Sequence, residues 1–145
     1  MSAHDFVLKD QFDNDVNLAD YKGKKILLSF HPLAWTSVCA IQMQDLDARY
    51  DQFIAKGVAP FGMSVDQQYS KEAWGESLGI KKLPMLADFW PHGALAKALG
   101  CFIEKAGVSG RQQFLIGPDG DVLWTKRHEI PEQPDFDAIL KELPN

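Results

Sequence analysis

Residues 26–39 read ILLSFHPLAWTSVC, and this stretch decides how the chain folds. Its first five residues form a short apolar run, typical of strands that are buried on both faces of a sheet. Pro32 ends the strand, because proline has no backbone N–H to donate to a central ladder. From Ser37 to Lys56 apolar residues recur every three or four positions, which predicts a helix that Gly57 ends. The apolar stripe of this helix consists of Cys39, Met43, Leu46, Tyr50 and Phe53.

Strands and helices continue to alternate along the rest of the chain. Ser70 is the expected cap of one further helix, and Gly79 its expected end. Strands alternate with helices along the chain, and a final hairpin and helix follow them. This order predicts an α/β protein, with a mixed central sheet flanked by helices. A thioredoxin-like arrangement with an N-terminal hairpin satisfies this order. Residues 1–145 contain no linker or repeat, so we expect a single domain. The further strands are expected at residues 58–65, 84–89, 111–116 and 122–126, the hairpin at 6–18 with its turn at 13–15, and the helices at 70–78, 93–99 and 134–143.

The composition of the chain limits the binding partners and the cellular compartment that we expect. Fifteen basic against twenty acidic residues give a net charge of −5, which argues against binding to nucleic acids or anionic membranes. The chain shows neither a signal peptide nor an apolar stretch that could span a bilayer, and two cysteines suit a reducing compartment, so we expect a cytoplasmic protein. The four histidines lack metal-ligand spacing, and glycine-rich nucleotide motifs are absent. We therefore expect neither a metal nor a cofactor.

Cys39 has the position of a reactive cysteine. It is expected in the first turn of its helix, where unpaired backbone N–H groups and the helix dipole stabilise a thiolate. Thr36 is expected to cap the helix and to hydrogen-bond the sulfur or a bound oxygen, while Pro32 narrows the loop and shields it from water. These features suit a nucleophile that attacks an O–O bond. The alternative is a structural role, because free cysteine is often a small buried residue.

The spacing Pro32-x-x-x-Thr36-x-x-Cys39 after a buried strand resembles the active-site signature of the peroxiredoxins, the alkyl hydroperoxide reductase and thiol-specific antioxidant family. Residues 107–116, GVSGRQQFLI, are similar to the family segment that carries its active-site arginine. Residues 88–93, DFWPHG, resemble its one-cysteine bacterial members. The resemblance covers essentially the whole chain. It implies a thiol peroxidase that reduces hydrogen peroxide and organic hydroperoxides through a cysteine sulfenic acid.

The resemblance also assigns roles to individual residues. It implies that Arg111 faces Cys39, stabilises its thiolate and orients peroxide, where a lone arginine would otherwise be a solvated surface charge. The backbone N–H groups of Val38 and Cys39 would donate to the peroxide oxygens. Two positions depart from the family pattern. Gln42 stands where many members have glutamate, so it can bind Arg111 but brings no charge. His31 replaces a tyrosine or phenylalanine, and we expect a packed ring there, although it could titrate near neutrality.

The sulfenic acid must be reduced by a thiol before it is oxidised further. The positions that usually hold a second, resolving cysteine have none here, since residue 44 is Gln and no cysteine lies near the C-terminus. Cys101 is the remaining candidate, and a small buried residue on a strand is its simpler interpretation. A disulfide would require the two α-carbons within about 7 Å. We expect a one-cysteine mechanism with an external thiol such as thioredoxin, glutaredoxin with glutathione, or a mycothiol-like donor, and by family habit a homodimer.

Two other functions remain open from the sequence. The same fold could serve as a thiol–disulfide oxidoreductase, which is disfavoured because Gln42 stands where a thioredoxin motif needs its second cysteine. It could also be a non-catalytic, chaperone-like binding module. Fast oxidation of Cys39 by hydrogen peroxide would separate a peroxidase from both.

Overall fold

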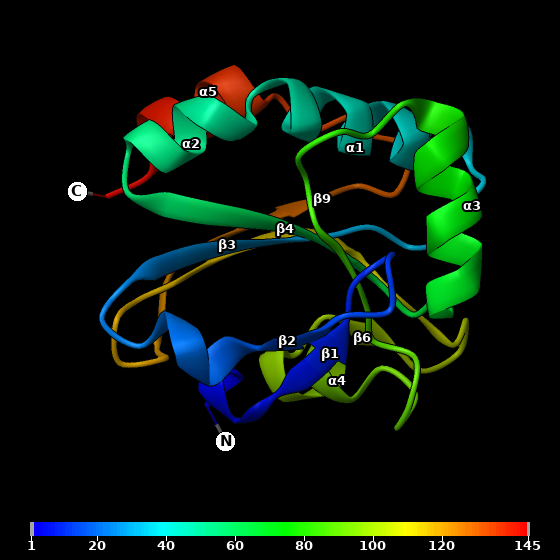
Figure 1. The fold of residues 1–145 in the computed structure, drawn as a ribbon, viewed down its shortest axis with the longest axis horizontal. Coiled ribbons are helices and arrows are strands. Elements are labelled where there is room, and N and C mark those ends of the chain that lie inside the picture. Colours follow the sequence, from blue (N-terminus) through cyan, green and yellow to red (C-terminus); the bar gives the residue numbers. More distant parts are fainter. Residues whose placement is uncertain (1, 145) are drawn as a thin grey trace.

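A seven-stranded sheet runs through the centre of the protein, as the computed structural model of residues 2–144 shows. Its strand order is β2-β1-β5-β4-β3-β8-β9. The central strand β3 (Lys25–Phe30) pairs in parallel with β4 (Val58–Ser64) and antiparallel with β8 (Arg111–Ile116). The sheet is therefore mixed, and the predicted α/β class with a thioredoxin-like order is confirmed (Figure 1).

The other elements flank or extend this sheet. A separate two-stranded sheet joins β6 and β7, which are too short for a sequence pattern to reveal. No helix within residues 2–144 has the length and apolarity that a bilayer crossing requires. The remaining strands are β1 (Val7–Lys9), β2 (Asp15–Asn17), β5 (Met85–Ala87), β6 (Phe102–Ile103), β7 (Val108–Ser109) and β9 (Val122–His128). The helices are α1 (Ser37–Ala48), α2 (Tyr50–Ala55), α3 (Gln68–Leu78), α4 (Ala94–Leu99) and α5 (Phe136–Glu142), with 3-10 helices η1 (Ala3–Asp5) and η2 (Leu18–Tyr21).

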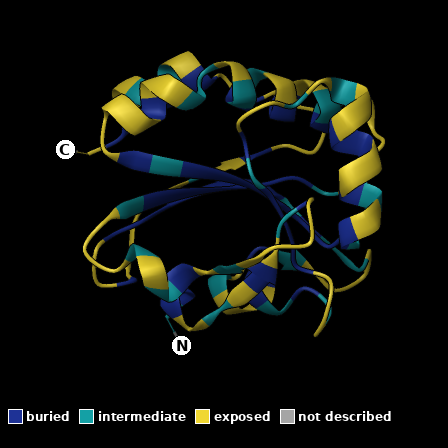
Figure 2. Cartoon of the chain, viewed as in Figure 1, coloured by how far each residue is buried: buried dark blue, intermediate teal, exposed yellow. Residues whose placement is uncertain are grey.

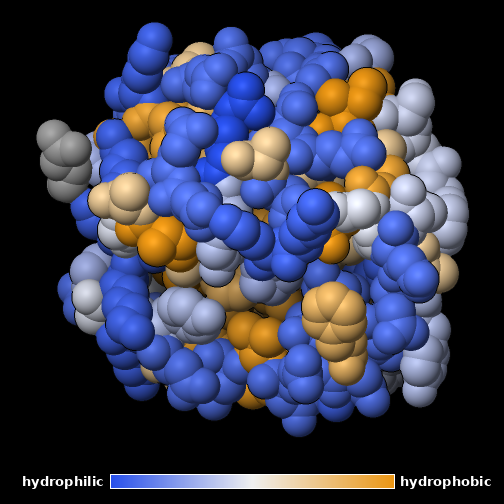
Figure 3. All heavy atoms as spheres, turned by 45° about the horizontal axis from the view of Figure 1, so that its top comes forward, coloured by the Kyte–Doolittle hydropathy of each residue, from blue (hydrophilic) through white to orange (hydrophobic). Residues whose placement is uncertain are grey.

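The sheet separates two hydrophobic cores. Helices α1, α2 and α5 cover one face and α4 lies on the other, while α3 stands at one end (Figure 1). Successive residues of a strand point to opposite faces, so Leu28 of β3 enters the core with α4 and Leu27 the core under α1. The central strands are accordingly buried along their length, whereas the outer faces of the helices are exposed (Figure 2). On the face seen in Figure 3, hydrophobic side chains form separate islands among hydrophilic ones.

Several helix boundaries differ from expectation, and α5, expected at 134–143, spans Phe136–Glu142. The predicted helix 37–56 is broken at Arg49 (φ −104, ψ 11), which separates α1 from α2. The expected cap at Ser70 is wrong: Gln67 caps α3, since its side-chain oxygen accepts from the backbone N–H of Tyr69 at 2.7 Å. The helix thus begins two residues before Ser70. Its predicted end is confirmed, with Gly79 in the left-handed region at φ +72.

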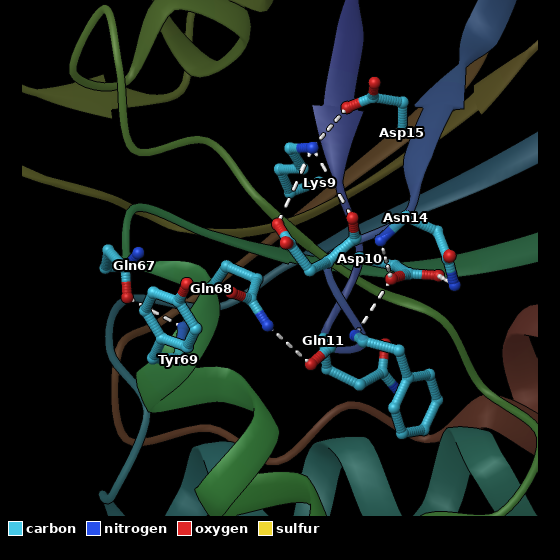
Figure 4. A network of polar contacts seen from close by, with 10 residues as sticks. Lys9, Asp10, Gln11, Asn14, Asp15, Gln67, Gln68 and Tyr69 are labelled. Carbon is cyan, nitrogen blue, oxygen red and sulfur yellow. Dashed lines mark hydrogen bonds and ion pairs between the residues drawn. The ribbon is translucent and has the colours of Figure 1, made fainter.

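The N-terminal hairpin is confirmed, but its turn lies at residues 10–14 and not at 13–15, because Asp15 already pairs with Lys9 as the first residue of β2. The hairpin is joined to the start of α3 by buried amide side chains (Figure 4). Gln68 donates through Nε2 to the backbone oxygen of Gln11 at 2.9 Å. Gln11 in turn donates through Nε2 to Leu83 O at 2.9 Å and accepts from Met85 N at 2.8 Å. These contacts fix α3 against β5 and the hairpin.

Candidate active site

Cys39 lies where the loop after β3 turns into a helix. It is the third residue of α1 and is only 1% exposed. The first backbone N–H of α1 to reach a loop carbonyl is that of Ala40, which donates to Thr36 O at 2.9 Å. The N–H groups of Val38 and Cys39 precede it, at the end of a helix that leaves such groups unpaired. Cys39 is thus in the first turn, as predicted.

Arg111 reaches Cys39 from a distant part of the chain. In the β3–β8 register, Phe30 lies opposite Gln112, so the first residue of β8 arrives at the end of β3. The Arg111 side chain is 3% exposed and its Nη1 lies 3.4 Å from Cys39 Sγ. Its Nε donates to Ile130 O at 2.9 Å, which fixes the plane of the guanidinium. The structure therefore brings Cys39 and Arg111 together.

Gln42 holds the same guanidinium. It lies one turn after Cys39 and accepts from Arg111 Nη1 at 2.6 Å. Its own Nε2 donates to Ser29 Oγ at 2.8 Å and to Phe30 O at 3.2 Å, so the buried amide is paired at both ends. Over the part of the chain that the structure describes, Arg111 forms no salt bridge with a carboxylate. The Arg111 guanidinium therefore lies between the neutral Gln42 amide and the Cys39 sulfur.

Thr36 does not act as expected. It occupies the N-cap position of α1 (φ −107, ψ 150), but its side chain makes no capping hydrogen bond. Its Oγ1 donates instead to Leu33 O at 2.9 Å, across the loop and away from the helix end. The expectation of a capping bond is wrong because the hydroxyl closes the loop on itself. Pro32 lies half-buried at the start of that loop.

Residues that the sequence analysis missed hold the loop from the other side. The Asp66 carboxylate accepts from the backbone N–H of Ala34 and from Ser64 Oγ, both at 2.7 Å. Trp35, in the left-handed region at φ +69, donates through Nε1 to Ser70 Oγ at 2.9 Å. The active-site loop is thereby fastened to the end of β4 and to α3. No local signal in the sequence indicates these contacts.

A buried lysine and a buried histidine lie behind the loop. Lys71 and His31 are both fully buried, and Lys71 Nζ is 3.5 Å from His31 Nε2. Burial, with the positive charges of Lys71 and Arg111, holds the pKa of His31 well below its usual range, so His31 is neutral at pH 7. The packed ring expected for His31 is found. Lys71 shares the spacing of Trp74 and Leu78 on α3, and this apolar stripe is the signal that could have revealed it.

Cys101 lies on the opposite side of the sheet from Cys39. The two thiols are free, and they belong to different cores, Cys101 to that of Phe30 and Phe114 and Cys39 to that of Leu27. Burial, helped by the negative charge of Asp88, raises the pKa of Cys101 to about 12. This cysteine is a protonated thiol at neutral pH. Within the described range, no three His, Cys, Asp or Glu side chains gather as a metal site would require.

Comparison with known proteins shows the family to which the chain belongs. Residues 1–125 match the model of the AhpC/TSA family. The chain is 34% identical over 135 residues to alkyl hydroperoxide reductase E of Mycobacterium tuberculosis, covering 92% of this chain and 88% of that protein. The crystal structure of Enterococcus faecalis AhpC superposes with a TM-score of 0.85 at 25% identity, covering 98% of this chain and 89% of the other. The reduced 2-Cys peroxiredoxin of Plasmodium vivax gives 0.83 at 28% identity, covering 92% and 72%. With its buried cysteine and arginine joined at the start of α1, the chain belongs to the AhpC/TSA family of peroxiredoxins and is a thiol peroxidase.

Proposed function

We propose that Cys39 is the peroxide-reacting thiolate and that it works without a second cysteine of the chain. The observation that carries this proposal is the 3.4 Å contact between Arg111 Nη1 and Cys39 Sγ, in a site where a neutral amide replaces the carboxylate. A buried, permanently charged guanidinium favours the ionised sulfur. The substrates are hydrogen peroxide and organic hydroperoxides, and a relative named alkyl hydroperoxide reductase supports the second class.

The chemical step is a displacement at oxygen. The Cys39 thiolate attacks one peroxide oxygen, so that an S–O bond forms and the O–O bond breaks. The sulfur is oxidised to a sulfenic acid, and the leaving hydroxide or alkoxide takes a proton and departs as water or an alcohol. Arg111 and the N–H groups of Val38 and Cys39 stabilise the charge that develops on the oxygens. Pro32 and Thr36 shape the loop that admits the peroxide.

An external thiol completes the cycle in this proposal. Cys101 belongs to the other core and is held protonated, which makes it a poor partner for Cys39. A thiol from outside attacks the sulfenic sulfur and releases water, and a second thiol frees Cys39 and leaves the reductant as a disulfide. Thioredoxin, glutaredoxin with glutathione, and mycothiol-like thiols are the candidate classes. A cytoplasmic location would supply any of these.

A homodimer is the assembly that we propose. Large aromatic side chains are exposed around the start of α3, where a second copy could cover them. Trp35 is bound to Ser70, next to the exposed Tyr69. Trp90 lines a cavity of about 220 Å³ together with Gln67 and Gln68. Residues 67–70 are consecutive, so both tryptophans lie beside the start of α3.

Stopped-flow mixing with hydrogen peroxide tests the peroxidase proposal, with tryptophan fluorescence as the signal. We expect oxidation much faster than that of free cysteine, and none in Cys39→Ser. Arg111→Ala is expected to slow it about 10²-fold, the usual effect of removing a donor at a developing charge. Cys101→Ser is the matched control and is expected to keep the rate of the unaltered chain. A rate no higher than that of free cysteine would contradict the proposal.

A further inference from the structure

The carbonyl that holds Arg111 belongs to a short turn after β9. Ile130 O accepts from Arg111 Nε at 2.9 Å. The backbone N–H of Glu132 donates to Glu129 O at 3.0 Å and closes the turn. Pro131 occupies the third position of this turn, where proline is unfavourable in the commonest turn type because it restricts the residue before it. The turn that carries the Ile130 carbonyl therefore needs support from side chains.

The Glu132 carboxylate supplies this support with both of its oxygens. Its Oε1 accepts from the backbone N–H of Glu129 at 3.1 Å, and its Oε2 lies 3.3 Å from His128 Nδ1. The hydrogen bond from Glu129, helped by the one from His128, lowers the pKa of Glu132, so the carboxylate is ionised at pH 7. Burial lowers the pKa of His128 although Glu132 opposes this, so the ring is neutral at pH 7. Because an ionised carboxylate can only accept, the proton of the neutral ring lies on Nδ1.

His128 anchors this arrangement to the sheet. It is the last residue of β9, it is 5% exposed, and it lies opposite Arg111 in the β8–β9 register. Residues directly opposite each other in an antiparallel pair have neighbouring side chains on the same face of the sheet. Glu132 therefore ties the turn that holds the guanidinium to the place on the sheet from which Arg111 projects.

We propose that Glu132, anchored on His128, is a positioning residue for Arg111. By fastening the turn it sets the direction of the Ile130 carbonyl, and this carbonyl holds the guanidinium whose Nη1 lies 3.4 Å from Cys39 Sγ. The inference rests on the proposed role of Arg111 beside Cys39. Neither Glu132 nor His128 contacts the peroxide in this scheme. Their effect reaches the reaction through Arg111, since a small misplacement of a group at the reacting centre is enough to slow a reaction.

Glu132→Met tests the contact directly, because methionine has a similar length but no carboxylate. The side chain of Glu132 is half-exposed, so its replacement leaves both cores intact. The measurement is the exchange of the Arg111 Nε–H with solvent, followed by NMR in isotope-labelled protein and assigned by the absence of this signal in Arg111→Lys. We expect exchange about fivefold faster in Glu132→Met, the factor that corresponds to the loss of one ordinary hydrogen bond.

Matched variants separate the loss of this contact from a change in net charge. Glu132→Gln keeps one acceptor oxygen and should give an exchange rate between those of the unaltered chain and Glu132→Met. His128→Phe keeps a buried ring without Nδ1 and should also speed the exchange. Glu104→Met removes an exposed carboxylate from another turn and should leave the exchange unchanged.

A double-variant cycle shows whether the effect on peroxide oxidation passes through Arg111. Glu132→Met should slow the oxidation of Cys39 about tenfold, which is less than the effect of losing the guanidinium itself. In the Arg111→Ala background the same change should have no further effect, because the group that it positions is absent. A role in packing alone would slow the reaction equally in both backgrounds.

Two results would overturn the proposal. One is an Arg111 Nε–H exchange that Glu132→Met and His128→Phe both leave unchanged, and the other is a slowing as large in Arg111→Ala as in the unaltered chain. The exchange measurement needs no peroxide chemistry. A chain in which Glu132→Met speeds the exchange but which does not react with hydrogen peroxide would therefore contradict the proposed function and leave the positioning role of Glu132 supported.

Discussion

At the scale of single residues, the chemistry depends on what surrounds one guanidinium. Arg111 Nη1 donates to Gln42 Oε1 at 2.6 Å and contacts Cys39 Sγ at 3.4 Å, and its Nε donates to Ile130 O. A glutamate at position 42 would neutralise part of the arginine charge. With glutamine there, the hydrogen bond positions the arginine and its charge remains available to the sulfur.

Gln42→Met removes this hydrogen bond while keeping the side-chain volume. It leaves a buried Arg111 donor and the Ser29 hydroxyl without their partner, which should lower the free energy of unfolding by about 1–3 kcal/mol. Peroxide oxidation should also slow, because the guanidinium is no longer held beside Cys39. Urea denaturation and stopped-flow measure the two effects. Gln52→Met, exposed on α2, is the control and should change stability by less than about 0.5 kcal/mol. An equal loss in both variants would contradict the assignment.

Sequence patterns identified some of these residues and missed others for physical reasons. The position of Cys39 follows from local signals, a strand, a proline and a helical period. The pairing with Arg111 was reached through resemblance, because only the β3–β8 register brings the two together. Thr36 was expected to cap α1, but a hydroxyl has several acceptors within reach and composition does not choose between them. Lys71 lies on an apolar stripe, a local signal that was available.

At the scale of elements, α1 packs directly on the backbone of β4. A Cβ added at Gly62 would come within 2.4 Å of Met43 Sδ and 3.3 Å of Met85 Cγ. Met43 lies one turn after Cys39 in the same helix. The absence of a side chain at Gly62 therefore sets how closely α1, with Cys39, approaches the sheet.

Gly62→Ala should push α1 outward through Met43. Overpacking of this kind lowers the free energy of unfolding by about 1–3 kcal/mol, and the displaced helix should also slow the reaction of Cys39. Chemical denaturation and stopped-flow with peroxide measure both. Met43→Ala makes room, so the loss in Gly62→Ala/Met43→Ala should be smaller than the sum of the two single losses. Simple additivity would show that the two side chains do not compete for this space.

The order of strands and helices was predicted well because hydrophobic period and turn residues are local. The break between α1 and α2 was not, since Tyr50 and Phe53 continue the apolar spacing across it. What distinguishes Arg49 is a tertiary contact, an ion pair from its Nε to Asp137 of α5 at 2.8 Å. A pattern of apolar residues does not contain that information.

At the scale of the whole molecule, the sheet divides the protein into two cores and keeps the two thiols apart. The face of the sheet on which a residue packs depends on strand order and register. For Cys101, the sequence alone did not determine this face. The structure also buries two groups that titrate at alkaline pH, Lys71 on α3 and Cys101 just before β6. Their effects on stability have opposite signs.

The pH dependence of unfolding follows from these two groups. The pKa of Lys71 falls from 10.5 to about 8 on folding, so between these values the unfolded chain binds the extra proton and stability rises with pH. The pKa of Cys101 rises from 9.0 to about 12, so above pH 9 the folded chain keeps a proton that the unfolded chain loses, and stability falls. Each contributes up to about 1.4 kcal/mol per pH unit. We expect a rise from pH 8 to 9, a plateau, and a fall above 10.5.

Urea unfolding at pH 7 to 11 under reducing conditions checks this expectation. Lys71→Met should lose the rise relative to the unaltered chain, and Cys101→Ser should lose the fall. A rise of the same size in Lys71→Met would contradict the burial of a titrating lysine.

The most direct test of the central claim is to find where the first oxygen goes. The reduced protein is mixed with one equivalent of hydrogen peroxide in the presence of a sulfenic-acid trap such as dimedone, and its peptides are analysed by mass spectrometry. We expect the adduct on Cys39, an unmodified Cys101 and no intramolecular disulfide. A Cys39–Cys101 disulfide, or an adduct on Cys101 with Cys39 unmodified, would contradict the account.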